Sequence, residues 1–401
     1  MTKKTFLKIF ACILACANTL NLQAAGFALY EYSARGNAMG GAVLANKAEP
    51  ASIAANPALI TKLKGTQVQA GMTAVTVGGS TEIAGQKRDL KTSTFYLPNL
   101  YITRQMRDHI YLGVGLFSRF GLGGKYKDYS TWSSAISERQ SYRMDLVTYS
   151  VNPVMASRVT DDLSLAGGFE IMYAHLIEDK GFGRQNGVRI EGDSITWGAN
   201  FGLYYNPSWA EKWGAALTYR TKTRHLASGE VSGTGLFTSA SGEATAALAL
   251  PDQLAFGLSF APLKKLTFEA DIMGIFWSSY KQLRIDYNDL RAPNNEFKHY
   301  KDVYRFSLGA EYSLTDNWDL RAGYVYDESP INHKYMDTMV PADDRHIFSG
   351  GVGYNAKGFG VDVSYSYMIV SDLTGTTEHG QTAKYKDATS HMIGLSFKYA
   401  F

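Results

Sequence analysis

The sequence predicts an all-β fold, a roughly 14-stranded antiparallel transmembrane β-barrel with an N-terminal plug, or hatch, inside it. Three observations predict this fold. Segments in which apolar residues alternate with polar or small ones recur from residue 66 onward, short and long connections alternate between them, and the chain finishes on an alternating strand, HMIGLSFKYAF. Alternation with a period of two places one set of side chains on each face of a sheet.

Residues 1–24 predict a cleaved secretory signal peptide. Two lysines precede a short apolar run, Ile9 to Ala17, and Leu22-Gln23-Ala24 resembles a cleavage site. The run is too short to span a bilayer. Both cysteines, Cys12 and Cys16, fall in this segment, so we expect no disulfide in the mature chain. Acylation of Cys16 is the alternative, but the residues before it fit a lipoprotein signal poorly.

We expect residues 25–65 to form the hatch. They do not alternate, they are rich in glycine and alanine, and they include apolar residues such as Phe27 and Ile53. A disordered periplasmic tail is the alternative, but a segment with this apolar content is expected to leave water. We therefore expect residues 25–65 to pack inside a barrel formed by residues 66–401.

Residues 66–401 predict the barrel. Clear alternation occurs at Trp197–Tyr205, Tyr304–Leu314 and Phe359–Met368. Transmembrane barrels connect such strands by tight periplasmic turns and longer outer loops. Short connections are expected at Arg107–Asp108, Thr160–Asp162, Pro262–Lys265, Thr315–Asn317 and Asn355–Lys357, and longer ones at 119–142, 178–189, 231–243, 287–300, 331–344 and 371–389.

A soluble β-sandwich is the competing all-β fold. It predicts no regular alternation of short and long connections, and it leaves a sheet edge that must be protected. In a barrel the last strand pairs with the first and no edge remains. This closure explains why His391–Phe401 predicts an ordered strand, where most chains end in a frayed tail.

Composition and motifs exclude several classes of function. The formal net charge of +3, without a basic block, does not indicate a nucleic-acid partner. The 8 histidines lack the spacing of a metal site, and no nucleotide-binding loop is present, so we expect neither a metal nor a cofactor. Gly192-Asp193-Ser194 is similar to a hydrolase serine block but precedes an ordinary strand, so we expect no enzyme activity.

Several short sequence motifs of the mature chain, in their order along it, resemble those of a known family. They are AGFALYEYS (Ala25–Ser33), NPALIT (Asn56–Thr61), FGLGGKY (Phe120–Tyr126), LPD (Leu250–Asp252), YKDVYRFSLG (Tyr300–Gly309), DNWDLRAGYVYDESP (Asp316–Pro330) and the closing YAF (Tyr399–Phe401). The chain resembles the FadL family of outer-membrane transporters for long-chain fatty acids and other hydrophobic compounds, nearly end to end.

The resemblance implies an integral protein of the bacterial outer membrane that transports a hydrophobic cargo passively. The cargo enters from outside, binds in an apolar pocket, and leaves sideways beside an inward kink in the third strand. The terminal Phe401 resembles the C-terminal aromatic by which outer-membrane barrels are handed to the β-barrel assembly machinery. Such a barrel contacts outer-membrane lipids, and because a self-closed ring needs no partner we expect a monomer. Three glycines within Gly121–Gly124 favour a bend there by themselves, although they also fit the start of a surface loop.

The resemblance also implies roles for individual residues. Phe27 would contact the ligand, or alternatively serve only as a packing anchor. Lys180 and Lys301, with Arg119 and Arg305 in reserve, would pair with the ligand carboxylate, because burying it unpaired is costly. Lys180 could instead be a solvated loop charge, and Lys301 could pair with Asp302 or Glu296. The hatch and gate residues would be Asn56, Pro57, Ala58, Ser118, Phe120 and Gly121, with Asn56 bonded to Ser118.

Other functions stay open on the sequence. A channel for neutral aromatic hydrocarbons would not need Lys180 or Lys301. An outer-membrane lipase or a structural or adhesin barrel are alternatives of a different class. The outer connections near 132–142 and 179–189 look short, which predicts a reduced outer groove and a smaller cargo.

Overall fold

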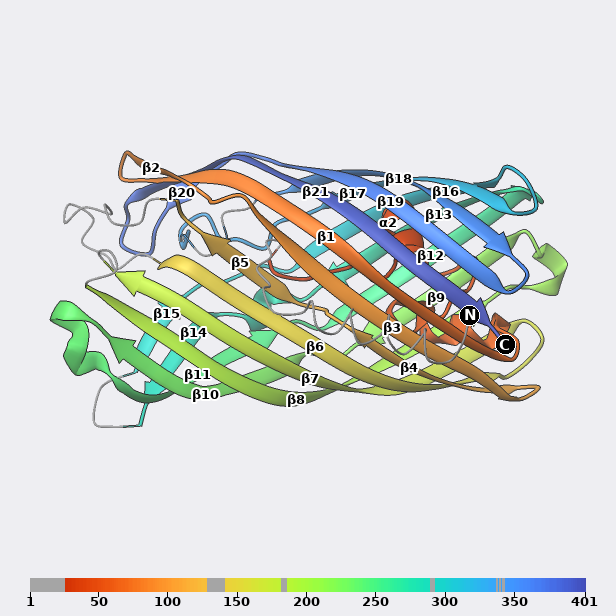
Figure 1. The fold of residues 1–401 in the computed structure, drawn as a ribbon, viewed down its shortest axis with the longest axis horizontal. Coiled ribbons are helices and arrows are strands. Elements are labelled where there is room, and N and C mark those ends of the chain that lie inside the picture. The colour runs from red at the N-terminus through yellow and green to blue at the C-terminus, as the bar shows by residue number, and fades with distance from the viewer. Residues whose placement is uncertain are drawn as a thin grey trace.

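The chain forms a closed antiparallel barrel of 14 strands (Figure 1). The computed structural model describes residues 26–127, 141–181, 186–288, 293–336, 338, 340 and 343–401. The ring closes because β1 (Thr66–Ile83) pairs with β21 (Thr382–Ala400) from Gln67–Ala400 to Ile83–Ala383. The predicted signal peptide and the predicted loop residues 128–140 lie outside the described residues.

Several strands of the ring consist of two segments in series. The ring begins with β1, and its other strands follow in this order, with the two segments of a divided strand joined by 'with': β3 (Ser93–Arg107), β4 (Ile110–Phe117) with β5 (Gly121–Lys125), β6 (Ser141–Arg158), β7 (Leu163–Gly181), β8 (Gly187–Tyr205), β9 (Trp213–Arg220) with β10 (Thr223–Gly233), β11 (Gly242–Leu250) with β12 (Gln253–Leu263), β13 (Leu266–Ile275) with β14 (Gln282–Tyr287), β15 (Asn294–Phe297) with β16 (Val303–Ser313), β17 (Trp318–Asp327), β18 (Arg345–Ala356), β19 (Phe359–Val370) and β21. The short strands β2 (Gln86–Asp89) and β20 (Leu373–Thr376) pair alongside the ends of β1 and β21.

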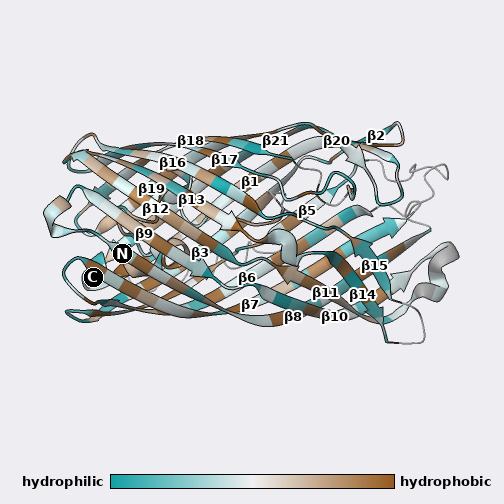
Figure 2. Cartoon of the chain, turned by 180° about the vertical axis from the view of Figure 1, so that it is seen from behind, coloured by the Kyte–Doolittle hydropathy of each residue, from teal (hydrophilic) through white to brown (hydrophobic). Residues whose placement is uncertain are grey.

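The apolar residues of the alternating strands face outward, and the polar and small ones face inward. On β19, Val363 and Tyr365 are exposed, whereas Asp362 and Ser364 are buried. The same holds on β21, where Leu395 is exposed. Hydrophobic and hydrophilic residues accordingly alternate along the strands (Figure 2). This arrangement is the one required where the solvent is lipid and the lumen is polar.

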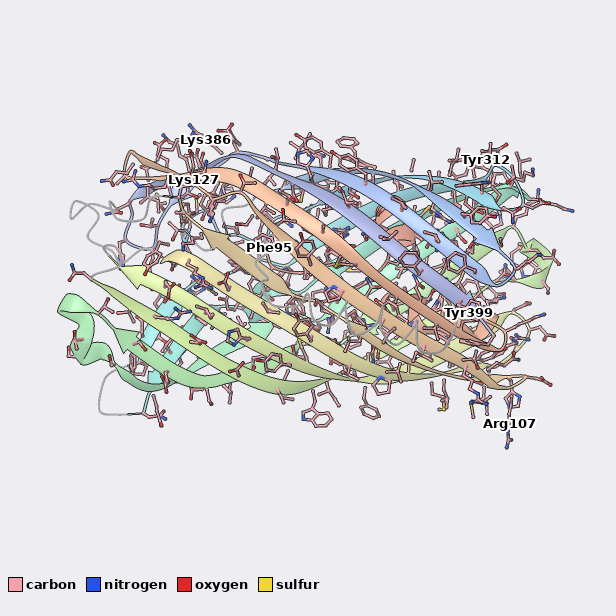
Figure 3. The ribbon with its side chains drawn as sticks, in the orientation of Figure 1. Phe95, Arg107, Lys127, Tyr312, Lys386 and Tyr399 are labelled. Atoms are coloured by element: carbon pink, nitrogen blue, oxygen red, sulfur yellow. The ribbon has the colours of Figure 1, made fainter. Side chains whose placement is uncertain are left out.

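The connections differ in length at the two ends of the barrel. Short turns, including those at Arg107–Asp108 and Lys264–Lys265, lie at the end that carries the C-terminus (Figure 1). Arg107, Tyr312 and Tyr399 lie at this end, and Lys127 and Lys386 lie at the opposite one (Figure 3). Strands β7 and β8 extend through much of 178–189, which the sequence predicted to be a loop; that boundary was wrong.

Residues 26–65 lie inside the ring of strands. This segment holds α2 (Ala34–Ala38), α3 (Ser52–Ala55) and the 3₁₀ helix η1 (Pro57–Lys62). Helix α2 packs against β17, β18, β19, β21 and β1, whereas η1 packs against β4, β6, β7 and β8. The segment therefore contacts opposite walls. Short 3₁₀ helices also occur at η2 (Ser208–Ala210), η3 (Gly235–Ala240) and η4 (Trp277–Ser279), and no described helix is long and apolar enough to cross a membrane.

Charged side chains of the wall hold the internal segment in place. Arg35 of α2 donates to Glu311 of β16 over 2.9 Å, and Lys47 pairs with Asp319 of β17 over 2.9 Å. On the other side, Arg220 of β9 donates to the carbonyl oxygens of Ile53 (2.9 Å) and Ala54 (2.8 Å). Arg220 thereby satisfies carbonyls that a short helix leaves without intrahelical partners.

Candidate functional site: an apolar pocket beside an interrupted strand

The third strand of the ring is interrupted between β4 and β5. Strand β4 pairs with β3 from Leu100–Leu116 to Arg107–Ile110, and also with β6. Strand β5 pairs with β6 alone among the described strands. Residues 93–99 of β3 therefore have a ladder partner on the β1 side only, within the described chain. The wall separates at this point, and Phe95 lies on the unpaired stretch of β3 (Figure 3).

The first described residues of the internal segment pair with the interruption from the inside. The N–H of Leu29 donates to the carbonyl oxygen of Arg119 (2.7 Å), and the N–H of Gly121 donates to that of Phe27 (2.8 Å). An antiparallel bridge joins Ala28 to Phe120 between them. Residues 27–29 therefore form a backbone strap across the interruption, and they satisfy groups that the missing β3 ladder leaves open.

One side chain of the neighbouring strand fixes the interrupted segment. The hydroxyl of Thr148, on β6, donates to the carbonyl oxygen of Phe120 (2.6 Å) and accepts from its N–H (3.1 Å). Thr148 is fully buried, and it replaces two backbone bonds that a regular strand would make. The sequence did not single out Thr148.

An apolar pocket adjoins the strap. Its cavity measures about 10 Å³, and its lining is almost wholly apolar and aromatic: Phe27, Leu122, Met144, Leu146, Leu176, Leu248, Tyr280, Leu283, Lys298, Tyr300 and Val340. The ring of Phe27 packs edge-on against Trp277 (4.7 Å between centroids) and Tyr280 (5.6 Å). Leu122 belongs to β5, so the pocket reaches the interrupted strand directly. The sequence did not single out Trp277 or Tyr280.

Lys298 is the basic residue in the lining of this pocket. It is buried, and its Nζ lies 3.4 Å from Oε2 of Glu296. Lys180, a predicted site residue, is also buried and pairs with Glu296 and, at 3.1 Å, with Glu178. The structure thus brings Lys180 and Lys298 to one carboxylate.

Lys301, predicted to meet the ligand carboxylate inside the barrel, is exposed. Its place in the pocket is taken by Lys298, three residues earlier. His299 between them adopts a positive φ of 44°, and this turn separates the directions of the two lysines. No sequence signal distinguished the two residues, because such a turn at a non-glycine residue is uncommon.

The two predicted arginines are committed to other partners. Arg119 is fully buried and binds Glu170 over 2.8 Å and Gln253 over 3.2 Å. Arg305 binds Asp327 over 3.1 Å. Arg119 lies on the strap's partner segment and outside the lining of the apolar pocket. The structure therefore does not bring either arginine into that pocket.

Asn56 forms a different set of bonds from the one expected. Its amide nitrogen donates to the carbonyl oxygens of Leu44 (2.8 Å) and Leu203 (3.2 Å), and its oxygen accepts from the N–H of Ala58 (3.1 Å). Asn56 thus caps η1 ahead of Pro57, as a turn residue should. The expected bond to Ser118 is wrong, because both polar ends of Asn56 already have partners in the hatch and on β8.

Among the described residues, no group of three or more His, Cys, Asp or Glu side chains is placed to hold a metal ion. The site is built to bind a ligand. It offers an apolar cavity, two lysines that share a carboxylate, and a backbone strap. These elements suit an amphipathic or apolar ligand.

Comparison with known proteins matches the chain to one family along nearly its whole length. The family model described as outer membrane protein transport protein (OMPP1/FadL/TodX) covers residues 15–401. The long-chain fatty acid transport protein of Escherichia coli K12 is 25% identical over 468 residues, 100% of both chains. Outer membrane protein P1 of Haemophilus influenzae Rd is 25% identical over 360 residues, 76% of this chain and 75% of the relative.

Solved structures show the same fold. A Pseudomonas aeruginosa FadL homologue superposes with a TM-score of 0.82 at 17% identity, covering 94% of this chain and 100% of that one. The Pseudomonas putida toluene transporter TodX gives a TM-score of 0.73 at 17% identity, with coverages of 93% and 99%. With the family model spanning the barrel and the internal segment alike, the chain belongs to the OMPP1/FadL/TodX family of outer-membrane transport proteins.

Proposed function

We propose that this protein carries long-chain fatty acids, or molecules of similar hydrophobicity, passively across the outer membrane. One observation carries the proposal: Phe27 belongs both to the apolar pocket and to the backbone strap over the interrupted strand. Its ring lines the apolar pocket, and its carbonyl oxygen accepts from Gly121 at the interrupted strand. A ligand that displaces the ring therefore acts on the strap that covers the interruption.

Capture is the easy step for such a cargo. A chain of ~15 methylenes gains roughly 12 kcal/mol on leaving water, at about 0.8 kcal/mol per CH₂. Release is the difficult step, because a pocket that keeps this whole gain does not let the ligand go. A transporter therefore needs a second state with lower affinity, and differential binding to the two states drives the change.

The pocket supports such a coupling because it is nearly full. A cavity of about 10 Å³ has room for about one water molecule, so an acyl chain enters only if lining side chains move. Phe27 is the lining residue on the movable internal segment, and residues 26–65 act as the hatch in this proposal. When Phe27 leaves, the Gly121 N–H loses its partner and the strap loosens.

Exit follows at the same place. Residues 93–99 of β3 and the segment 118–124 are not joined by backbone hydrogen bonds in the described chain. Passage between them breaks no ladder, so the cargo moves sideways into the bilayer, where lipid keeps it out of water. A self-closed ring does this as a monomer embedded among outer-membrane lipids.

In this proposal the carboxylate of the fatty acid binds Lys298 and Lys180 and takes the place of the Glu296 carboxylate, with which both lysines pair in the structure. Toluene is the cargo named for one structural neighbour, and a channel for neutral aromatics is the second candidate. Full-length similarity to fatty acid transport proteins and the buried lysine in the pocket favour the acid.

The test compares uptake of a radiolabelled 18-carbon acid with uptake of toluene by cells that carry Lys298→Met or, as matched control, Lys301→Met. Lys298→Met should lower acid uptake about tenfold and leave toluene uptake unchanged. Lys301→Met should change neither, because its side chain is exposed. Equal uptake by Lys298→Met and wild type for both cargoes would remove the carboxylate clamp, and toluene uptake without acid uptake in the wild type would favour the hydrocarbon channel.

A hydrolase is the alternative function of another class, and one serine–histidine contact in the barrel could be taken to favour it. The hydroxyl of Ser194 lies 2.8 Å from Nδ1 of His225 on the inner wall. The other ring nitrogen faces Thr223 Oγ1 at 3.4 Å, so no described carboxylate completes a triad. We propose that the pair is structural; ester hydrolysis by the purified protein that disappears in Ser194→Ala would contradict this. A purely structural or adhesin barrel would show no uptake of either cargo.

A further inference from the structure

Two buried polar side chains next to the interrupted strand have no hydrogen-bond partner in the described chain. Asn99 on β3 is 4% exposed, and neither its amide nitrogen nor its oxygen is bonded. Ser118, the residue after β4, is 8% exposed, and its hydroxyl is equally unbonded. Buried polar groups are almost always satisfied, and each exception costs about 1–3 kcal/mol.

Other buried asparagines, in the wall and in the internal segment, show that the lumen offers partners. Asn152 on β6 donates to the carbonyl oxygen of Phe169 (2.6 Å) and to Oδ1 of Asn200 (2.9 Å). Asn56 satisfies its nitrogen and oxygen with three bonds. Among the buried asparagines of the described chain, Asn99 is the one whose amide nitrogen and oxygen are both unbonded.

Asn99 and Ser118 flank the point at which the wall separates. The last backbone pair between β3 and β4 is Leu100–Leu116. Asn99 is the next residue along β3, and its side chain faces the lumen, as do those of Leu97 and Tyr101 on either side. Gly71 of β1 leaves room for it, since a Cβ there would lie 3.0 Å from Oδ1 of Asn99.

The cargo needs polar partners at this point. Once its head group leaves Lys298, an unpaired carboxyl group that crosses a wall of apolar residues loses the hydrogen bonds it had in water. The amide N–H of Asn99 and the hydroxyl of Ser118 are donors, and both are uncharged. Uncharged donors lower the barrier to passage without holding the acid as tightly as a lysine does.

We propose that Asn99 and Ser118 are specificity-determining residues that bind the carboxyl group of the fatty acid as it passes the lateral exit. This inference rests on the proposed function and adds a second polar site to it. The cargo class that uses this site is an acid, because an aromatic hydrocarbon has no group to accept these hydrogen bonds.

The matched control lies on the same strand. Thr103 of β3 is 2% exposed, and its hydroxyl is also unbonded in the described chain. It pairs with Gly113 where β3 and β4 are continuous, so it lies in the closed part of the wall. Thr103→Val removes an unbonded buried hydroxyl without touching the exit.

The experiment measures uptake of an 18-carbon acid and of toluene by cells with wild type, Asn99→Leu, Ser118→Ala or Thr103→Val, at equal amounts of heat-modifiable folded protein. Asn99→Leu should lower the acid-to-toluene ratio about tenfold and Ser118→Ala should lower it less, whereas Thr103→Val should leave it unchanged. Affinity of purified Asn99→Leu for the acid, followed by tryptophan fluorescence, should stay at the wild-type value, because the pocket is intact.

An unchanged ratio in both exit variants overturns the inference, and so does an equal fall in Thr103→Val. If Asn99→Leu does not fold, Ser118→Ala decides between the two outcomes. A wild type that takes up no acid overturns the proposed function itself, a result distinct from a wild type whose acid uptake Asn99→Leu leaves unchanged.

Discussion

Two neighbouring carboxylates on the inner face of β13 hold the internal segment through its backbone. Oε1 of Glu269 accepts from the N–H of Ala45 (2.6 Å), and Oδ2 of Asp271 accepts from that of Val43 (3.0 Å). Both carboxylates are buried, and neither forms a salt bridge with a described cation. Because two charges side by side in a buried place repel each other, ionisation of both carboxyl groups is unfavourable.

Asp271→Asn should therefore stabilise the folded protein. The amide keeps an oxygen for the N–H of Val43, its nitrogen can donate to Glu269, and a second negative charge can no longer form beside Glu269. The free energy of unfolding in detergent should rise by about 1–3 kcal/mol. Urea unfolding, followed by the loss of the fast-migrating folded band on a gel, measures it.

Asp362→Asn is the matched control. Asp362 is also a buried aspartate of the inner wall, but it pairs with Arg321 (2.7 Å) and Lys398 (2.8 Å). Losing one charge there leaves cations uncompensated and should cost about 3–5 kcal/mol. The same direction of change in both variants would contradict the argument.

At the scale of an element, the interrupted strand depends on Thr148. Thr148→Val keeps the shape of the side chain and removes both bonds to the backbone of Phe120. The amide of Phe120 should exchange with deuterium about tenfold faster, since opening costs one hydrogen bond less. Peptides from β1 and β21 should exchange as before.

Thr76→Val is the control for this element. The hydroxyl of Thr76 bonds that of Thr94 (2.8 Å) on the outer surface between β1 and β3, and it makes no bond to the interrupted segment in the described chain. It should leave exchange at Phe120 unchanged. Equal rates at Phe120 in Thr148→Val and wild type would show that the strap alone fixes the segment.

Strands with a lipid-facing side could be predicted from the sequence, because lipid requires apolar residues at every second position while the lumen accepts polar ones. Residues such as Val363 and Leu395 are apolar and exposed, and their neighbours along the strand are not. The ends of β7 and β8 could not be predicted, because buried charges there looked like a solvated loop. Glu178 and Lys180 pair with each other inside the lumen, and alternation cannot report such a pair.

The site was predictable only in part for the same reason. Phe27 could be placed at the pocket through the family resemblance, and so could the interruption before Gly121. Lys298 could not be told from Lys301, because a turn at His299 separates them. The partners of Asn56 are Leu44 and Leu203, and contacts with residues that far away along the chain leave no local signal.

At the scale of the whole molecule, ring closure and delivery make separate demands on the last residue. The N–H of Phe401 donates to the carbonyl oxygen of Thr66 (2.9 Å), while its side chain is 76% exposed. Phe401→Ser should leave the unfolding free energy of refolded protein within about 0.5 kcal/mol of wild type, because an exposed side chain buries little.

We propose that the assembly machinery reads the terminal aromatic, so the same variant should reduce the amount of protein in the outer membrane. Quantitative blotting of outer-membrane fractions measures this. Phe268→Ser, which removes an exposed aromatic from the outer face of β13, serves as the comparison. Equal loss in the two variants would argue against a special role for the terminus.

The internal segment touches walls that come from both halves of the chain. Helix α2 packs on β17, β18, β19 and β21, whereas η1 packs on β4, β6, β7 and β8, and the seam between β1 and β21 joins the earliest strand to the latest. Synthesis delivers the internal segment first and the β1–β21 seam last, so we expect the cylinder to close around a segment that is already present. Once sealed, the occupant cannot slip out past intact walls, and the mature protein is expected to owe its lifetime to a slow escape rate more than to a deep energy minimum.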